Sequence, residues 1–320
     1  MRRPTQAQTN PFPYTDSNKR YHTYDYDLRH RYGGKCAKVV LDAGMTCPNI
    51  DGSKGSGGCI YCSSSGSGDF ALPALSLREQ YDRQRQNLSR KWEVQGYIPY
   101  LQAHTNTYAT PQRVRAILEE LLSFPDIVGI SLATRADCIS PQMAALLGEV
   151  AERTDLTVEL GLQSVFDDTA VRINRCHTYA DFLEGFARLR QAGKMRIAVH
   201  LINGLPGEDE AQMVESARRV GALGVEEIKL HLLYVLRSTP LAALYERGDY
   251  RPMEREAYVR TVVRQLEWIP PQTVIGRLTG DAPREELLAP LWSLQKFTVM
   301  NDIDRLLYVE NSMQGRFLSV

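Results

Sequence analysis

The chain has no long apolar run and no excess of charge of either sign. No stretch reaches the roughly 18 consecutive apolar residues of a membrane-spanning helix, and the N-terminus has no apolar signal-peptide core. The 38 Lys and Arg residues balance 38 Asp and Glu residues, so no overall field favours nucleic acid or a membrane. With six cysteines and none of these segments, we expect no membrane partner and a reduced soluble compartment, the cytoplasm.

Two catalytic signatures are also missing. The glycine-rich stretch at 52–58 lacks the G-K-[ST] ending of a phosphate-binding loop, and G-x-S-x-G occurs nowhere in the chain. Nucleotide hydrolysis by a P-loop and serine hydrolase chemistry are therefore disfavoured.

The hydrophobic pattern alternates between short strands and amphipathic helices. It predicts strands at 35–42, 98–103, 127–133, 156–162, 195–202 and 227–233, and helices at 77–95, from 111, from 141, from 167, at 179–193, at 208–223 and at 240–247. Consecutive βα units need crossover connections and hence a mostly parallel sheet, which favours a barrel or part of one.

The pattern divides the chain into three parts. Residues 1–20, rich in proline and polar side chains, are expected to form a flexible tail, and 21–250 the barrel. Residues 251–320 are expected to form an extension with a helix at 255–268, an extended piece at 273–279 and helical patterns around Trp292 and Ile303. We expect this extension to close the open side of the barrel or to hold determinants of a macromolecular substrate. In 21–31, aromatic residues alternate with charged ones; we expect them to cover a hydrophobic edge rather than stack on bases.

Polar side chains follow the later strands, where loops gather at the carboxyl edge of a parallel sheet. Such a set at one edge predicts a small-molecule site, although a single polar residue there is more often a helix cap. The set comprises Thr105, Asn106, Thr134, Arg135, Asp137, Gln163, Ser164, His200, Asn203, Gly204, His231 and Tyr234.

Three cysteines follow the first strand with the spacing Cys47-x11-Cys59-x2-Cys62. Thiolates suit iron–sulfur clusters and zinc, and both usually take four ligands. A cluster with three cysteines has one iron free for another ligand, which points to catalysis; zinc and ordinary free thiols remain alternatives. Cys36, Cys138 and Cys176 are interpreted as inert thiols, although Cys176 beside Arg175 could be reactive.

Longer motifs surround these cysteines along most of the chain. They are C-P-N-I-D-G-S-K-G-S-G-G-C-I-Y-C at 47–62, Y-L-Q-A-H-T-N-T-Y at 100–108, T-R-A-D at 134–137, G-L-Q-S at 161–164, N-R-C-H at 174–177, H-L-I-N-G-L-P-G-E at 200–208, K-L-H-L-L at 229–233 and R-L-T-G-D at 277–281. With them the chain resembles the YhcC/YtqA-like branch of the radical S-adenosylmethionine (SAM) enzymes, relatives of the elongator catalytic subunit. It departs from the usual pattern at Ala136, where proline is common, and at Cys176, where glycine is common.

The resemblance implies a fold and two cofactors. The fold is an α/β partial (β/α)6 TIM-like radical SAM barrel with a C-terminal α-rich extension. A [4Fe–4S] cluster on Cys47, Cys59 and Cys62 would bind SAM through its free iron, cleave it reductively and generate a 5′-deoxyadenosyl radical that abstracts hydrogen from a substrate.

The same resemblance implies roles for four further residues. Gln163 and Arg175 match contacts to the methionyl and ribose part of SAM, His200 matches a position facing the ribose, and Tyr61 would shield the adenine. The alternatives are a helix cap for Gln163, a surface ion pair for Arg175 and a core histidine for His200.

The relatives make tRNA the leading substrate, through modification of the wobble-uridine side chain, with a flavodoxin or ferredoxin as electron donor. Arg and Lys residues in 78–91 and in 29–31 could contact phosphates. A radical enzyme acting on a small metabolite, like the porphyrinogen oxidases, and a non-enzymatic iron–sulfur or zinc protein are the alternatives.

Overall fold

The structure is a computed structural model that describes residues 10–63, 66 and 74–318. Seven parallel strands form one curled sheet, and all of its neighbouring pairs run in the same direction. In sheet order the strands are β1 (Cys36–Leu41), β2 (Gly96–Leu101), β3 (Ile130–Thr134), β4 (Leu156–Gln163), β5 (Arg196–Asn203), β6 (Glu227–Leu232) and β8 (Val274–Arg277). A partial barrel is thereby confirmed, with β8 from the extension as the seventh strand.

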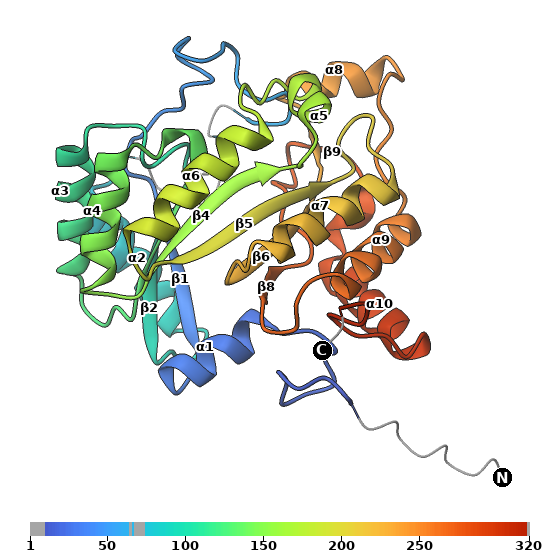
Figure 1. The fold of residues 1–320 in the computed structure, drawn as a ribbon, viewed down its shortest axis with the longest axis horizontal. Coiled ribbons are helices and arrows are strands. Elements are labelled where there is room, and N and C mark those ends of the chain that lie inside the picture. Colours follow the sequence, from blue (N-terminus) through green and yellow to red (C-terminus); the bar gives the residue numbers. More distant parts are fainter. Residues whose placement is uncertain (1–9, 64–65, 67–73, 319–320) are drawn as a thin grey trace.

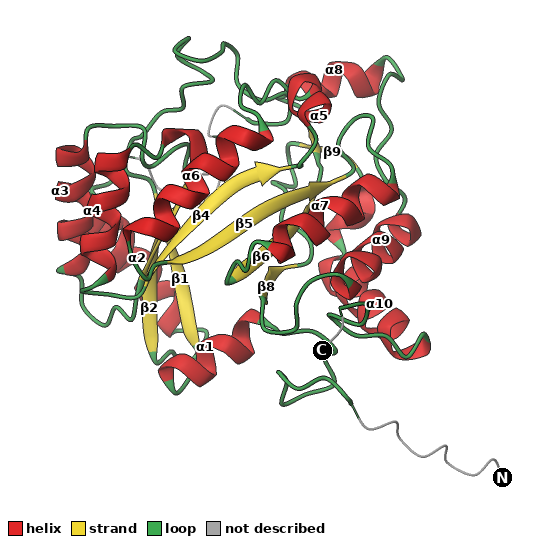
Figure 2. Cartoon of the chain, in the orientation of Figure 1, coloured by secondary structure: helices red, strands yellow, loops and turns green. Residues whose placement is uncertain are grey.

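Helices pack around this sheet, most of them on its outer face, as Figures 1 and 2 show. They are α1 (Tyr24–Tyr32), α2 (Leu77–Ser89), α3 (Pro111–Leu122), α4 (Pro141–Ala151), α5 (Asp167–Arg172), α6 (Tyr179–Ala192), α7 (Glu210–Ala222), α8 (Pro240–Glu246), α9 (Arg255–Glu267) and α10 (Lys296–Val309), with short 3₁₀ turns at Ala136–Cys138 and Leu291–Leu294. The helices leave the inner face of the sheet to line the lumen of the half-barrel.

Side chains alternate strictly along the central strands. On β4, Val158 and Leu160 are buried in the main core under the helices, whereas Glu159 between them points to the other face. Because successive residues of a strand face opposite sides, one face of the sheet is apolar and the lumen face carries charge.

Local sequence signals fix most helix starts. The Ser76 hydroxyl accepts from the amide of Glu79 in a capping box, and Thr110 and Ser140 cap α3 and α4 immediately before a first-turn proline. These are the starts that the sequence predicts.

The structure differs from the prediction at three places. Helix α2 ends at Ser89 rather than at 95, because the chain must reach β2, where Gln95 N donates to Lys35 O at 2.7 Å. Residues 24–32 are a helix, begun by Thr23 and ended by Gly33 in the left-handed conformation (φ 75°). A small antiparallel pair, β7 (Val235–Leu236) with β9 (Leu287–Ala289), was not predicted.

Helix α1 covers an edge of the sheet, as the sequence predicts for this segment. Leu28 and Tyr24 pack on Cys36 and Ile98, at the amino ends of β1 and β2. Thr23 also bridges to Ile275 of β8, so α1 spans from the first strand to the last across the bottom of the half-barrel.

The tail expected at 1–20 lies partly outside the described residues, which begin at 10. In the described part, Phe12 is buried and Arg20 donates to the carbonyl of Ser312, 3.3 Å away. Among the helices described, none has the length and hydropathy to cross a membrane.

Candidate functional site

The cysteine loop follows β1 at the carboxyl edge of the sheet and folds back on itself. Pro48 O accepts from Lys54 N at 2.9 Å, and Gly58 N donates to Asn49 O at 2.8 Å. Gly57 and Gly58 both have positive φ, which glycine adopts without strain. The eleven-residue insert is therefore a compact turn that returns the chain to Cys59 rather than an open flap.

Gly55 shows why this turn needs a residue without a side chain. A Cβ at Gly55 would collide with the amide oxygen of Asn49 and lie 2.6 Å from Cys176 Sγ. The loop thus packs directly on the segment that follows α5.

The thiols of the loop interact with one another. The Cys62 thiol donates a hydrogen bond to the Cys59 sulfur, which lowers the pKa of Cys59 and raises the pKa of Cys62. Cys59 is buried, with 3% of its surface exposed. The charge of Cys47 also raises the pKa of Cys62. All three predicted ligands therefore lie in one neighbourhood.

Two nitrogen donors point at the Cys59 sulfur. Asn49 Nδ2 lies 3.6 Å and Arg175 Nη1 3.8 Å from Cys59 Sγ, and both side chains are buried. Hydrogen bonds and positive charge stabilise a thiolate and tune any iron bound to it. This donor set, three thiols with amide and guanidinium N–H groups, fits an iron–sulfur cluster.

No three His, Cys, Asp or Glu side chains in the described ranges are placed to hold one metal ion. A mononuclear zinc site needs its sulfur ligands all at about 2.3 Å from the same ion. A cubane cluster differs, since each cysteine binds a different iron. The arrangement therefore gives no support to a zinc site among these residues.

Arg175 is held by hydrogen bonds at its side chain and at its backbone carbonyl. Its Nη2 donates to the carbonyl of Gly161 on β4, and its own carbonyl accepts from Arg135 Nη1 at 3.0 Å. Arg135 is in turn fixed by Asp137, with both N–O distances 2.9 Å.

Asp137 ties this arrangement to the cysteine loop, because Lys54 Nζ lies 2.7 Å from its carboxylate. Burial alone would raise the pKa of Asp137, but hydrogen bonds and charge from Arg135 and Lys54 outweigh it and lower the pKa. A buried ion network thus connects the loop, β3 and the backbone of Arg175.

Gln163 lies at the same place. It has a positive φ of 75° at a bulge between β4 and β5, and a Cβ on Gly161 would lie 2.8 Å from its Nε2 and 3.2 Å from Arg175 Nη2. Arg175 therefore links Cys59, through its Nη1, to Gly161 and Gln163, and the sequence predicted Cys59, Gln163 and Arg175 as site residues.

Tyr61 lies beside the thiols. Burial raises the pKa of its phenol, and the neighbouring charge of Cys59 raises it further. The ring packs against an apolar cluster that contains Ile173 and Leu233.

His200 belongs to a different group of side chains. Its Nε2 lies 2.8 Å from Glu159 Oε2, and its ring stacks on His231 with centroids 5.0 Å apart. No described contact joins it to the cysteines.

Several polar residues at the strand ends are bonded within the protein. Asn106 Nδ2 donates to the carbonyls of Leu101, Ala103 and Ala133, and Asn203 exchanges two 2.8 Å bonds with Gln265. These amide nitrogens support the edge of the sheet, while the Asn106 Oδ1 is buried and has no partner among the described residues.

The other thiols lie outside the cluster neighbourhood or are shielded. Cys36 is buried in β1 among Leu28 and Ile98, and burial raises the pKa of Cys138 to about 12. Cys176 has a φ of 55°, which accounts for the glycine usual at this position in similar sequences.

Comparison with known families settles the class of protein. The family described as Radical SAM superfamily matches residues 52–220, and the Radical_SAM C-terminal domain matches residues 225–308. The chain belongs to the radical SAM superfamily. Members of this superfamily use a [4Fe–4S] cluster and S-adenosylmethionine.

Relatives of this radical SAM protein cover nearly its whole length. YtqA of Bacillus subtilis is 45% identical over 311 residues, 97% of this chain and 96% of YtqA. YhcC of Escherichia coli K12 is 36% identical over 293 residues, 91% of this chain and 93% of YhcC. The resemblance to the YhcC/YtqA-like branch is confirmed.

A solved structure shares the fold. Elp3 of the archaeon Methanocaldococcus infernus, without its N-terminus, has a TM-score of 0.65 at 15% identity, and the match covers 87% of this chain and 64% of that chain. At this identity the likeness concerns the fold alone.

Proposed function

We propose that this radical SAM protein cleaves S-adenosylmethionine reductively and removes a hydrogen atom from tRNA, in the modification of a wobble-uridine side chain. The observation that supports the first half is that Arg175 contacts the Cys59 sulfur with one nitrogen and lies beside Gln163 at Gly161 with another. The second half rests on the similarity to Elongator complex protein 3, which in Danio rerio is 31% identical over 214 residues, 65% of this chain and 36% of that protein.

In this proposal Cys47, Cys59 and Cys62 hold the cluster. When bound, the cluster supplies the single electron for the cleavage of SAM, received from a flavodoxin or ferredoxin. Asn49 and Arg175 donate toward Cys59 and stabilise its thiolate. The Arg175 Nε is buried and has no partner among the described residues, so its N–H can donate to the carboxylate of SAM.

Gln163 and Tyr61 complete the cofactor site. The Gln163 amide, next to the guanidinium of Arg175, supplies both a donor and an acceptor for the ribose or methionyl part. Tyr61, whose burial keeps its phenol neutral, covers the thiols against water and offers a flat face to adenine.

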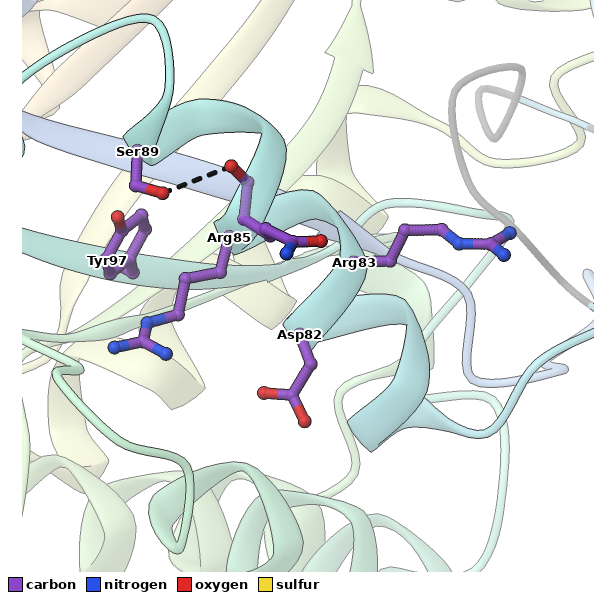
Figure 3. A pocket seen from close by; sticks show the side chains of 6 residues that line it. Asp82, Arg83, Arg85, Ser89 and Tyr97 are labelled. Atoms are coloured by element: carbon purple, nitrogen blue, oxygen red, sulfur yellow. Dashed lines mark hydrogen bonds between the residues drawn. The ribbon is translucent and has the colours of Figure 1, made fainter.

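A hollow along α2 supports a polyanionic substrate. It encloses about 510 Å³ and is lined by Asp82, Arg83, Arg85, Gln86, Ser89 and Tyr97. Figure 3 shows Arg85 directed toward Tyr97, while Arg83 points to the other side of the helix. The Arg85 guanidinium lies 5.6 Å from the centroid of the Tyr97 ring. An arginine over an aromatic face is suited to base stacking and to contact with a phosphate.

Not every cation of α2 is free for this role. Arg78 pairs with Asp82 at 2.7 Å, and Arg85 pairs with Asp126. In the part of the chain that the structure describes, no ion pair involves Arg83 or Arg90, which makes these two the best candidates for phosphate contacts.

Binding tests the tRNA part of the proposal. Charge reversal of Arg83 and Arg90 should weaken tRNA binding at low salt and reduce the slope of log affinity against log salt by about 0.7–0.9 for each phosphate that the protein no longer neutralises. Reversal of Arg115, which is exposed and paired with Glu149 on another helix, is the matched control. Absence of tRNA binding at low salt, or equal binding by all variants, would refute tRNA as the substrate.

Product analysis tests the reaction. The reconstituted holoenzyme is incubated anaerobically with reductant, SAM and tRNA, and the nucleosides are separated by mass. A wobble uridine of changed mass, absent with Cys59→Ala, is the expected result. Unchanged nucleosides beside rapid SAM cleavage would show that the substrate is something other than this tRNA.

A further inference from the structure

The lumen of the half-barrel contains a cluster of charged and polar side chains, of which only His200, which the resemblance places facing the ribose of SAM, belongs to the predicted cofactor site. Each of the first six strands contributes one member. They are Lys38 from β1, Tyr100 from β2, Ser131 from β3, Glu159 from β4, His200 from β5 and Lys229 from β6. Barrel interiors are normally filled by branched apolar side chains, so this composition needs an explanation.

Glu159 is the centre of the cluster. Its side chain is fully buried, and its Oε1 accepts from Lys38 and from Ser131 Oγ at 2.6 Å. Its Oε2 accepts from Lys229, from Tyr100 Oη at 2.9 Å and from His200 Nε2 at 2.8 Å.

The cluster holds more donors than acceptors. A carboxylate has about four lone-pair positions, whereas each ammonium group alone brings three N–H donors. The next carboxylate, Glu227, is 3.8 Å from Lys229 Nζ, beyond a hydrogen bond, and its Oε1 has no partner among the described residues. Both ammonium groups also lie over the Tyr100 ring, 4.8 Å from its centroid for Lys38 and 5.1 Å for Lys229, but among the described contacts neither has an oxygen acceptor within hydrogen-bond distance other than Glu159.

A neighbouring histidine adds to this surplus. The Nε2 of His231, stacked on His200, is buried and unpartnered within the described chain. Buried polar atoms normally have partners, and such orphans often mark a place for a ligand or a water. The side chains of Lys38 and His200 are 18% and 16% exposed, so solvent reaches the cluster.

The cluster lies directly below the cofactor site. Glu159 and Gly161 are two residues apart on β4, about 6.6 Å along the strand, and Gly161 O is the acceptor for Arg175. His200 is the partner of Gly161 in the adjacent strand, and Lys229 is the partner of His200. A substrate group placed in the lumen between them would be close to the site where SAM is proposed to bind.

We propose that Lys38, Lys229 and His231, organised by Glu159, form a subsite for a carboxylate or carbonyl oxygen of the substrate. The inference rests on the proposed function only in taking the lumen as the place of the substrate. Lys38 and Lys229 supply N–H donors and positive charge, and Glu159 is a positioning residue that keeps the two ammonium groups together despite their repulsion.

The charge state of Lys229 supports this assignment. Burial and the charge of Lys38 lower the pKa of Lys229 to about 8, although Glu159 opposes them. An additional oxygen acceptor in the lumen therefore stabilises the protonated amine.

A thermal-unfolding titration of the reconstituted protein tests the subsite. Acetate is the anionic probe, acetamide is the neutral carbonyl probe, and chloride at equal ionic strength is the reference. A saturable rise of about 2 °C in Tm at ten times the apparent Kd is expected for acetate. An equal rise with acetamide would assign the subsite to a neutral carbonyl, and a rise with acetate alone to a carboxylate.

Lys229→Met and Lys38→Met should each remove the rise, while Lys194→Met, at an exposed position just before β5, should retain it. A shift no larger than that of chloride, or one that persists in both lumen variants, would overturn the proposal. The titration needs neither SAM nor tRNA, so it separates this inference from the proposed function. Modification of tRNA by a protein whose Tm does not respond to acetate or acetamide would refute the subsite alone. A rise in Tm with either probe, in a protein that does not modify tRNA, would refute tRNA as the substrate alone.

Discussion

Removal of the Glu159 carboxylate should destabilise the protein strongly. The side chain is fully buried and balances two ammonium groups, and loss of one partner from a buried ion pair costs about 3–5 kcal/mol. An unfolding entropy of about 2.1 cal/mol/K per residue gives about 0.7 kcal/mol/K for 320 residues. Glu159→Ala should therefore lower Tm by about 4–7 °C, with the lower end expected if Lys229 loses its proton.

The assay is thermal unfolding followed by circular dichroism at pH 7. Glu149→Ala is the control, because its pair with Arg115 is exposed and worth less than about 1 kcal/mol. Glu159→Met combined with Lys229→Met should recover part of the loss, since it removes the buried carboxylate together with one of its two ammonium partners and leaves only Lys38 charged. A Tm for Glu159→Ala within about 1 °C of the wild-type value would refute the reasoning that Glu159 holds the lumen cations.

Three further predictions concern the cofactor loop and acid stability. Cys59→Ala should abolish the iron–sulfur absorbance and the release of 5′-deoxyadenosine; retention of either contradicts its role as a ligand. Gly55→Ala should lower the iron content per chain several-fold, because its Cβ collides with Asn49, whereas the loop variant Ser56→Ala should bind iron normally. Burial lowers the pKa of His200 to about 4, so between pH 6.5 and 4 the unfolded chain binds a proton that the folded chain does not, and the free energy of unfolding should fall as the pH drops through this range. In urea titrations His200→Gln should reduce this fall by as much as about 3 kcal/mol. An unchanged pH dependence would argue against a neutral buried His200.

The sequence predicts the sheet well because each βα unit carries its own signals. A cap and a first-turn proline mark α3 and α4, and apolar runs mark the strands. Helix α1 was missed as a helix because its signals, Thr23 and Gly33, flank a segment with little apolar periodicity. The β7–β9 pair joins residues about fifty positions apart and has only two or three residues per strand, too few for a pattern.

The cofactor site was predictable in part. The cysteine spacing and the motifs identified Cys59, Gln163 and Arg175, which the fold brings together. The supporting contacts of Asn49 and the link from Lys54 to Asp137 depend on how the loop folds back, which spacing alone does not specify.

The lumen cluster was not predicted, because its members come from six strands spread over about 190 residues. The signal that could have found it is a charged residue at an inner position of a largely apolar strand. Lys38 in C-A-K-V-V-L, Glu159 in L-T-V-E-L-G-L-Q and Lys229 in E-I-K-L-H-L share this pattern. Charges buried on the same face of one curled sheet need partners of opposite charge, so together they indicate one cluster in its lumen.

The most direct test of the central claim is the measurement of 5′-deoxyadenosine. The protein is reconstituted with iron and sulfide under anaerobic conditions, reduced in the presence of S-adenosylmethionine and analysed by liquid chromatography. The proposed function predicts 5′-deoxyadenosine with the wild-type protein and none with Cys59→Ala. An intact, reducible cluster that releases no 5′-deoxyadenosine, with or without tRNA, would contradict it.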